Sequence, residues 1–303
     1  MKYYGIQNEV KAYINRLQDE NGIFVSTATV KTINDRVESL KRSGVWSRFS
    51  LGFNDADGDA YLARAGVTNP LGRCEVLWFT RGIKSLDLWN GLLCWPLRNY
   101  QNAGTGSTIF GLGGQGAFNA TIFNTAEWNV DGLRMVDTTS NGFARATFKV
   151  VTQDNFPLTM YVVNRKNGFG ISNFRTLGQI GNGVDLINIL RAGSTLGDGY
   201  RFSVTGMTDI VGSTLPLGIF YPMHGIVDRG RVSFNVNLGS TTTNTPALST
   251  FSTTNTVSFA TASPTGTGDS IQSVLIIILN REANLQLINT LYKSTLGNGL
   301  GLP

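Results

Sequence analysis

The feature that most constrains the fold is a series of short strand-like segments separated by glycine-rich turns. In residues 231–238 ("RVSFNVNL") apolar and polar residues alternate, which is typical of a strand with one buried face. Residues 158–163 and 274–279 are apolar runs, the first broken once by a threonine, as expected for strands covered on both faces. Turn signals such as Asn167-Gly168 punctuate the segments, and no helices alternate with them. The pattern predicts a mainly β protein, a β-sandwich.

Helical patterns lie near the two ends of the chain. Residues 4–44 predict two helices with one apolar face, broken at Asn21-Gly22, and Gly44 stands where a C′ glycine ends a helix. Three hydroxyl residues can serve as the N-cap of the second helix: Ser26, Thr27 and Thr29. A short helix is expected to close the chain, with Asn280 as its N-cap.

The chain divides into three parts on these patterns. Residues 1–48 form the predicted helical hairpin, which is too short to hold a core alone. Residues 49–105 have an irregular pattern and are expected to connect the hairpin to the sandwich and to be part of it. Residues 106–303 are the predicted sandwich. Within it, residues 239–268 are rich in Ser, Thr, Asn and Gly and predict a loop-rich edge with one exposed strand at Val257 and Phe259.

Composition excludes several classes of function. The 303 residues carry a net charge of +5 with no basic block, so the footprint of a nucleic-acid-binding protein is missing. No apolar run approaches the roughly 20 residues that span a bilayer, and residues 1–10 do not resemble a secretory signal. We therefore expect synthesis in a cytoplasm without membrane insertion. Cys74 and Cys94 are expected to be free structural thiols, with a disulfide between them as the alternative.

The stretch "GLGGQG", residues 111–116, matches the glycine pattern of a dinucleotide-binding turn. That motif needs a helix at its third glycine, to place a helix N-terminus beneath the pyrophosphate. The following residues 117–123, "AFNATIF", predict a strand or turn instead. The glycines are therefore interpreted as a tight bend at the start of the sandwich, and no cofactor is predicted.

Two groups of carboxylates are candidate sites. Asp55, Asp57 and Asp59 alternate as in a calcium loop, but the Gly and Glu that an EF-hand needs are replaced by Ala60 and Gly66. An acidic turn is the preferred interpretation and an irregular Ca²⁺ site the alternative. The second group is Glu127 and Asp131, which are four residues apart and lack the middle carboxylate of the E-x-D-x-E strand of retaining glucanases.

The histidine and most of the tryptophans are interpreted as structural residues. His224 is the one histidine, no G-x-S-x-G elbow supplies it with a nucleophile, and a zinc site would lack its other ligands. It is therefore interpreted as structural. Most of the tryptophans that might stack on sugars have apolar neighbours and are expected in the core: Trp78, Trp89, Trp95 and Trp128. No catalytic, metal-binding or cofactor-binding residue is predicted, and no binding residue is identified.

Three segments resemble parts of a known family. "LKRSGVWSRF" ends the hairpin, "LWNGLLCWPLRNYQNAGTGSTIF" followed by "AEWNVDGLRM" resembles the entry into a concanavalin A-like (laminin-G-like) jelly roll, and "VLIIILNREANLQLINTLYKSTLGNGLGLP" resembles the end of that fold. Together they are similar to virion structural proteins of tailed bacteriophages. The resemblance implies a non-enzymatic jelly-roll protein that decorates a head, forms part of a fibre or tail, or contacts host glycans.

The leading hypothesis is therefore a virion structural protein displayed on the particle and made in the host cytoplasm. Its hairpin is expected to bind other virion proteins or sister subunits in a homo-oligomer. The alternative is an adsorption protein that binds host surface glycans. A hydrolase using Glu127 and Asp131 is the third hypothesis.

Overall fold

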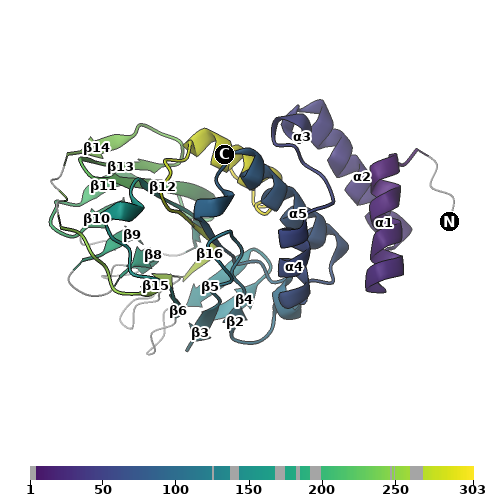
Figure 1. The fold of residues 1–303 in the computed structure, drawn as a ribbon, viewed down its shortest axis with the longest axis horizontal. Coiled ribbons are helices and arrows are strands. Elements are labelled where there is room, and N and C mark those ends of the chain that lie inside the picture. The colour runs from purple at the N-terminus through teal and green to yellow at the C-terminus, as the bar shows by residue number, and fades with distance from the viewer. Residues whose placement is uncertain are drawn as a thin grey trace.

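A computed structural model describes residues 5–124, 126–136, 143–167, 175–181, 185–191, 199–245, 248, 250–259 and 269–303. In this part of the chain two antiparallel β-sheets pack face to face, and helices cover one of them (Figure 1). None of the helices described is long and apolar enough to cross a bilayer.

The first sheet is built around two long central strands, β7 and β16, that are hydrogen-bonded to each other. Its strands in spatial order are β14 (Thr242–Asn244), β13 (Arg231–Val236), β12 (Phe220–Asp228), β7 (Leu158–Lys166), β16 (Asp269–Ile278), β5 (Gly132–Val136) and β4 (Ala126–Asn129). β1 (Leu92–Pro96) pairs with the C-terminal half of β16. The continuous apolar sequences of β7 and β16 thus belong to central strands that are buried on both faces, as predicted.

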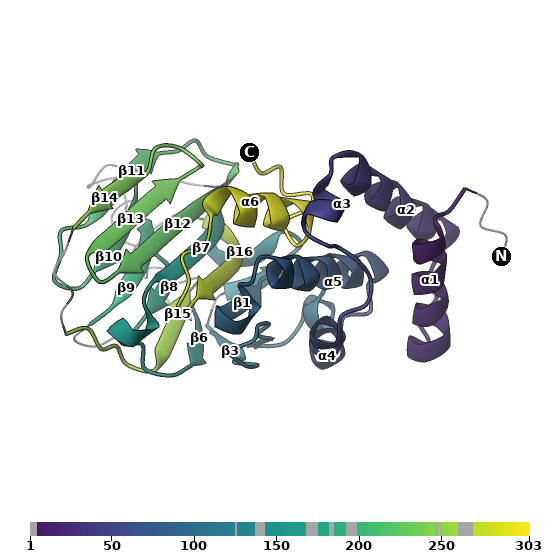
Figure 2. The same cartoon turned by 45° about the horizontal axis from the view of Figure 1, so that its top comes forward.

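The second sheet lies on the other side of the sandwich from the helices (Figures 1 and 2). Its strands in spatial order are β11 (Ile210–Thr214), β10 (Gly199–Val204), β9 (Ile187–Arg191), β8 (Arg175–Ile180), β15 (Thr256–Phe259), β6 (Phe143–Thr147), β3 (Ala120–Phe123) and β2 (Thr108–Ile109). Its inward side chains and those of the first sheet form one apolar core.

The predicted hairpin is present as α1 (Asn8–Asn21) and α2 (Thr27–Arg42). Gly22 ends α1 with a φ of 63°, a left-handed conformation that glycine adopts without strain. Ser26 is the N-cap of α2 and accepts a hydrogen bond from the Thr29 amide. A single turn, α3 (Val45–Arg48), follows Gly44.

The expectation that residues 49–105 are irregular is wrong. This segment contains α4 (Ala56–Arg64) and α5 (Pro70–Ser85), followed by β1. α5 starts at an Asn69 N-cap with Pro70 in its first turn. Its burial extends around nearly the whole helix, so its apolar residues do not form the single stripe by which an amphipathic helix is recognised. Figure 2 shows α5 between the sandwich and α1.

Two further details differ from the sequence prediction. β15 is not an exposed edge strand: it lies between β8 and β6, with Val257 and Phe259 in the core. The closing helix α6 (Leu285–Ser294) begins later than expected, because its N-cap is Asn284. Asn280 has a φ of 60° and belongs to the turn after β16.

The remaining short elements connect these parts. They are the 3₁₀ turns η1 (Trp89–Gly91), η2 (Gln101–Gly104) and η3 (Gln153–Asn155).

The helices and the helix-facing side of the first sheet share a second apolar cluster, to which β7 contributes Tyr161 and Val163 and β16 contributes Val274, Ile276 and Ile278. The first sheet therefore has a core on each of its two faces.

Candidate functional site

The glycine-rich stretch 111–116 is a bend, as the sequence predicts, and no helix follows it. Leu112 pairs with Cys94 of β1 through two backbone hydrogen bonds of 2.7 and 2.8 Å. A Cβ atom on Gly113 would lie 2.2 Å from the Leu92 carbonyl oxygen. A Cβ atom on Gly114 would lie 2.3 Å from the Trp89 carbonyl oxygen. The glycines let this segment pack directly on the backbone before β1 and at its start.

The three aspartates near residue 57 form the N-terminus of α4 rather than an acidic turn. Asp55 is its N-cap and accepts a hydrogen bond from the Gly58 amide, while Lys84 lies 2.8 Å from each Asp55 carboxylate oxygen. Asp57 also pairs with Lys84, and Asp59 pairs with Arg16. Negative charge is favourable at a helix N-terminus. In the described ranges no three His, Cys, Asp or Glu side chains are grouped as metal ligands.

His224 lies on β12 and is 5% exposed. Its Nε2 is 3.2 Å from the Ala283 carbonyl oxygen. Burial lowers the pKa of this imidazole to about 4, because the charged form loses its hydration. The side chain is therefore neutral near pH 7 and supports the contact between the sheet and the segment before α6.

Glu127 and Asp131 are paired with different arginines. Glu127 lies on β4 and contacts Arg134 at 3.0 Å, whereas Asp131 lies in the following turn and contacts Arg165 at 3.0 Å. Each carboxylate has its own arginine, and the two are not on one strand. This arrangement is that of surface ion pairs.

The tryptophans and cysteines lie mainly in the cores. Trp78 and Trp95 are fully buried, whereas Trp89 and Trp128 are half-buried. The Trp95 indole N–H donates to the Phe118 carbonyl oxygen at 2.7 Å. Cys74 and Cys94 are both buried free thiols, as preferred from the sequence, and burial raises the pKa of each.

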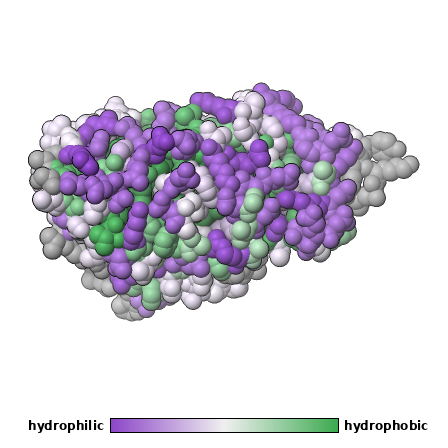
Figure 3. Space-filling model, in the orientation of Figure 1, coloured by the Kyte–Doolittle hydropathy of each residue, from purple (hydrophilic) through white to green (hydrophobic). Residues whose placement is uncertain are grey.

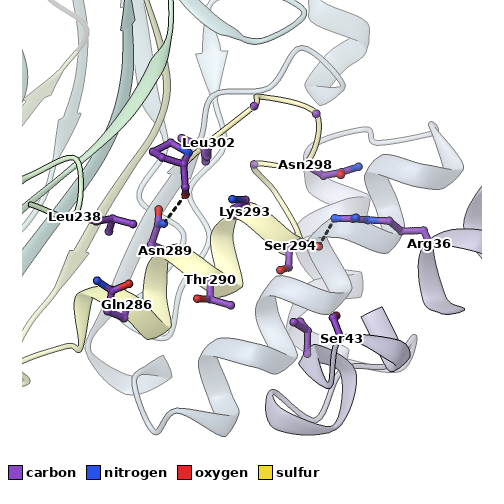
Figure 4. Close-up of a pocket in the computed structure, with 15 residues that line it drawn as sticks. Arg36, Ser43, Leu238, Gln286, Asn289, Thr290, Lys293, Ser294, Asn298 and Leu302 are labelled. Carbon is purple, nitrogen blue, oxygen red and sulfur yellow. Dashed lines mark hydrogen bonds between the residues drawn. The ribbon is translucent and has the colours of Figure 1, made fainter. Parts of the chain in front are cut away.

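A pocket of about 510 Å³ lies beside α6, and we call it the α6 pocket (Figure 4). It is bounded by α6, the C-terminal segment, Arg36 of α2 and Leu238. Arg36 donates to the Ser294 carbonyl oxygen at 2.9 Å, and Asn289 accepts a hydrogen bond from the Tyr161 hydroxyl at 2.8 Å. Its lining includes the cations Arg36 and Lys293 and no Asp or Glu side chain. The pocket can therefore accept a small polar or anionic group.

A second candidate lies on the outward side of the second sheet. We call it the β3–β6 patch, and it consists of Thr121, Phe123, Phe143, Arg145 and Thr147. Thr121 lies opposite Arg145, and Phe123 lies opposite Phe143. The two phenyl rings stack with centroids 4.7 Å apart, and the Arg145 guanidinium carbon is 4.9 Å from the Phe143 centroid. All five side chains are exposed except the half-buried Phe143.

Strand register extends the polar character of this patch across the sheet. From Arg145 the row of directly opposed residues runs through Ser258 and Gln179 to Asn188. Ser258 and Asn188 are buried, at 7% and 6% exposure. The accessible end of the row is therefore the β3–β6 patch.

Arg145 differs from six other arginines of the sandwich, each of which contacts a carboxylate: Arg134, Arg165, Arg201, Arg229, Arg231 and Arg281. Among the described residues Arg145 has no such partner. An exposed guanidinium on an aromatic ring has the planar fork of donors that binds a carboxylate through two hydrogen bonds.

The β3–β6 patch is not predicted from the sequence. The available signal was the alternation in β6, where Ala144 and Ala146 face inward and Phe143, Arg145 and Thr147 face outward. That signal is weak, because the stacking of Phe143 on Phe123 depends on the pairing of two strands separated by some twenty residues of chain.

No protein-family model and no curated protein sequence matches this chain. Solved structures do resemble it. The binding domain of botulinum neurotoxin serotype D superposes with a TM-score of 0.53 at 10% identity, over 68% of this chain and 52% of that one. The binding domain of botulinum neurotoxin DC, solved in complex with SialylT, has a TM-score of 0.51 at 13% identity with the same coverage.

Trypanosoma rangeli sialidase is also similar, with a TM-score of 0.49, 14% identity and coverage of 69% of this chain and 34% of the sialidase. The chain thus spans about half the length of the toxin domains and a third of the sialidase. The likeness to the toxin domains, with the two antiparallel sheets, defines the class: a jelly-roll-like β-sandwich with N-terminal helices and a C-terminal helix. The predicted fold class is confirmed.

Proposed function

We propose that this chain is a non-enzymatic carbohydrate-binding protein that takes acidic glycans at the β3–β6 patch. The observation that carries the proposal is Arg145, which is exposed, stacked on an aromatic pair and without a carboxylate partner in the described residues. The guanidinium of Arg145 suits an acidic sugar, because a guanidinium binds a carboxylate through two parallel hydrogen bonds.

The remaining patch residues suit the rest of a sugar. The exposed ring of Phe123 offers an apolar face for sugar C–H groups, and the hydroxyls of Thr121 and Thr147 can exchange hydrogen bonds with sugar hydroxyls. The toxin domain solved in complex with SialylT supports the choice of an acidic glycan, because that domain has a similar sandwich.

The environment of the chemistry-bearing side chains supports a non-catalytic role. Glu127 and Asp131 are each paired with an arginine, and His224 is buried against Ala283, which precedes α6. A glycosidase of the usual kind needs two carboxyl groups facing one cleft. Glu127 and Asp131, the carboxylate pair considered from the sequence, are each neutralised by a different arginine.

The test is binding of the purified full chain to immobilised sialylated glycans and to their neutral counterparts. We expect binding of the sialylated set only, and a loss of about tenfold or more for Arg145→Gln, because a charge-assisted hydrogen bond is removed. Lys293→Gln is the matched control, since it removes one cation from the α6 pocket instead.

Two outcomes would overturn the proposal. One is no binding to any acidic glycan, and the other is equal binding by Arg145→Gln and the unchanged protein. Loss of binding in Lys293→Gln with Arg145→Gln unaffected would assign the glycan to the α6 pocket. Circular dichroism of each variant shows whether the fold is kept.

We also propose, from the sequence resemblance to phage virion proteins, that the chain is displayed on a virus particle. The position of α1 and α2 at the end of the molecule away from the sandwich supports a docking role for the hairpin (Figures 1 and 2). Labelled antibody against the chain, applied to purified particles, tests this: absence of label rules out display. Deleting residues 1–48 is a poor test, because Tyr13 and Leu17 are buried and their loss would expose the core.

A further inference from the structure

The turn between α1 and α2 presents an exposed aromatic side chain. Phe24 is 76% exposed, the highest value among the exposed large apolar residues described. On the face drawn in Figure 3 the helical end of the molecule, α1 to α4, is mostly hydrophilic, so an aromatic ring in solvent is unusual there. Its neighbours Ile23 and Val25 are half-buried and buried, which anchors the turn and holds Phe24 outward.

Two acidic residues precede this turn. Asp19 and Glu20 are exposed at the C-terminal end of α1, and no basic residue lies in that last turn. Negative charge is unfavourable there, because the carbonyl end of a helix is itself negative. We call Asp19, Glu20 and Phe24 the α1 knob.

The same end of the molecule carries an open groove lined by aromatic residues. It has a volume of about 490 Å³, and α1 together with the 46–54 segment forms its walls. The rings of Tyr13 and Phe53 stack with their centroids 4.5 Å apart, and the centroids of the Trp46 and Phe53 rings are 5.9 Å apart. We call it the aromatic groove, and the exposed Ala12 lies on its α1 wall.

The charges at the rim of the aromatic groove complement those of the α1 knob. Glu9 is paired with Lys41 and Arg16 with Asp59, so these four charges balance. Arg81 donates to the Ser50 and Asn54 carbonyl oxygens at 2.8 and 2.9 Å. Both are neutral acceptors, and Arg81 has no carboxylate partner in the described residues, so the rim keeps one excess positive charge.

From this pairing of shape and charge we infer that the protein assembles with itself. The α1 knob of one copy inserts Phe24 into the aromatic groove of a second copy, and Asp19 and Glu20 lie toward Arg81. The half-buried Trp46 and the exposed Ala12 supply apolar surface for Phe24, whereas Tyr13 and Phe53 are buried in the wall of the groove. The excess positive charge offsets the acidic end of α1. This assembly is independent of the proposed glycan binding, which uses the outward side of β3 and β6 in the second sheet.

The α1 knob and the aromatic groove are different surfaces, so the contact has two modes. If two copies exchange knobs, each knob fills the other copy's groove and the product is a two-fold symmetric dimer. If they do not, a copy bound through its knob still has its groove open, and the contact extends into closed rings or open filaments. A contact of one turn and one groove is small, so we expect association that depends on concentration.

The test is sedimentation velocity of the purified full chain over a concentration series, with two variants that each remove one surface. Phe24→Ala removes the knob, and Ala12→Glu places a negative charge on the groove wall. We expect each variant to associate at least about tenfold more weakly than the unchanged protein. Two variants serve as controls. Ala12→Gln enlarges the same groove residue without adding a charge, and Val130→Ala shortens an exposed apolar residue of the sandwich, away from both surfaces.

Mixing the two variants separates this arrangement from other modes of assembly. Phe24→Ala keeps its groove and Ala12→Glu keeps its knob, so an equimolar mixture should form a one-to-one dimer and nothing larger. A contact between two Phe24 side chains that does not use the groove would instead let Ala12→Glu associate alone.

Three results would overturn the inference. They are an unchanged protein that stays monomeric at every concentration, a Phe24→Ala variant that assembles like the unchanged protein, and a mixture that forms no dimer. The first result would leave the aromatic groove as a site for another molecule. Circular dichroism and thermal unfolding of each variant exclude misfolding as the cause.

Discussion

The two faces of the first sheet are held against their neighbours by different kinds of interaction. Toward the second sheet, β7 and β16 present Met160, Val162, Leu275 and Ile277, all fully buried. Toward the helices, the same strands also face apolar residues, but hydrogen bonds accompany them: the Tyr161 hydroxyl donates to Asn289, and Ser273 is hydrogen-bonded to the Tyr292 hydroxyl. The sandwich interior is held chiefly by apolar area, whereas the helices are positioned on the sheet by hydrogen bonds as well.

The clearest polar feature of the helix side is Glu75 of α5, which is 5% exposed. It accepts a hydrogen bond from Asn298 at 3.1 Å, and Arg98 donates to the Leu296 and Asn298 carbonyl oxygens. Burial raises the pKa of Glu75 to about 7, although Arg98, Asn298 and Arg36 oppose this. These contacts hold the C-terminal segment against α5.

The largest expected effect lies in the sandwich interior. Phe202 is fully buried and stacks on Phe234 with centroids 5.6 Å apart. Phe202→Ala should lower the free energy of unfolding by about 3 to 5 kcal/mol, because it leaves a cavity. Denaturant unfolding measures this, and the loss should be the same at pH 5 and pH 8. The control Val211→Ala, on the same sheet but 52% exposed, should change stability by less than about 0.5 kcal/mol.

A smaller effect that varies with pH is expected on the helix side. The folded-state pKa of Glu75 is raised from about 4.5 to about 7, so the fold prefers the protonated acid. Its contribution to stability is fully present below pH 4.5 and is lost as pH rises through 7. Glu75→Gln keeps the acceptor for Asn298 and cannot ionise.

We expect the unchanged protein to lose about 3 kcal/mol relative to Glu75→Gln between pH 4.5 and pH 8. Unfolding by urea at several pH values measures the difference. A constant difference across that range would show that the charge of Glu75 is not isolated from solvent, and the contrast between the two faces would then be wrong.

The smallest effect concerns the start of α6. Asn284 caps this helix by accepting a hydrogen bond from the Leu287 amide at 3.1 Å. Asn284→Ala should cost about 1 kcal/mol. Asn280→Gly is the matched control, because a left-handed residue tolerates glycine, and it should cost less than about 0.5 kcal/mol. If Asn280→Gly lowers the unfolding temperature more than Asn284→Ala does, Asn280 is the N-cap of α6 instead.

The elements that could be predicted from the sequence have local signals. α1 and α2 show one apolar stripe each, and β7 and β16 are apolar runs. α5 was missed because its burial on nearly all sides hides the helical period. The β3–β6 patch was missed because it joins Phe123 to Phe143 across two strands. The aromatic groove likewise joins Tyr13 to Phe53, which are far apart in the sequence.

The sequence by itself determined that this is a mainly β protein with a helical hairpin and that residues 111–116 form a bend with no helix after it, and it favoured a structural place for His224. Periodicity and glycine placement decide such features, because they act over a few residues. Only the tertiary structure decided that α5 lies between the sheet and α1, that Glu75 is buried beside Arg98, and that Arg145 is left without a carboxylate partner among the described residues. These features depend on which distant segments come together, and the local pattern of a chain does not specify that.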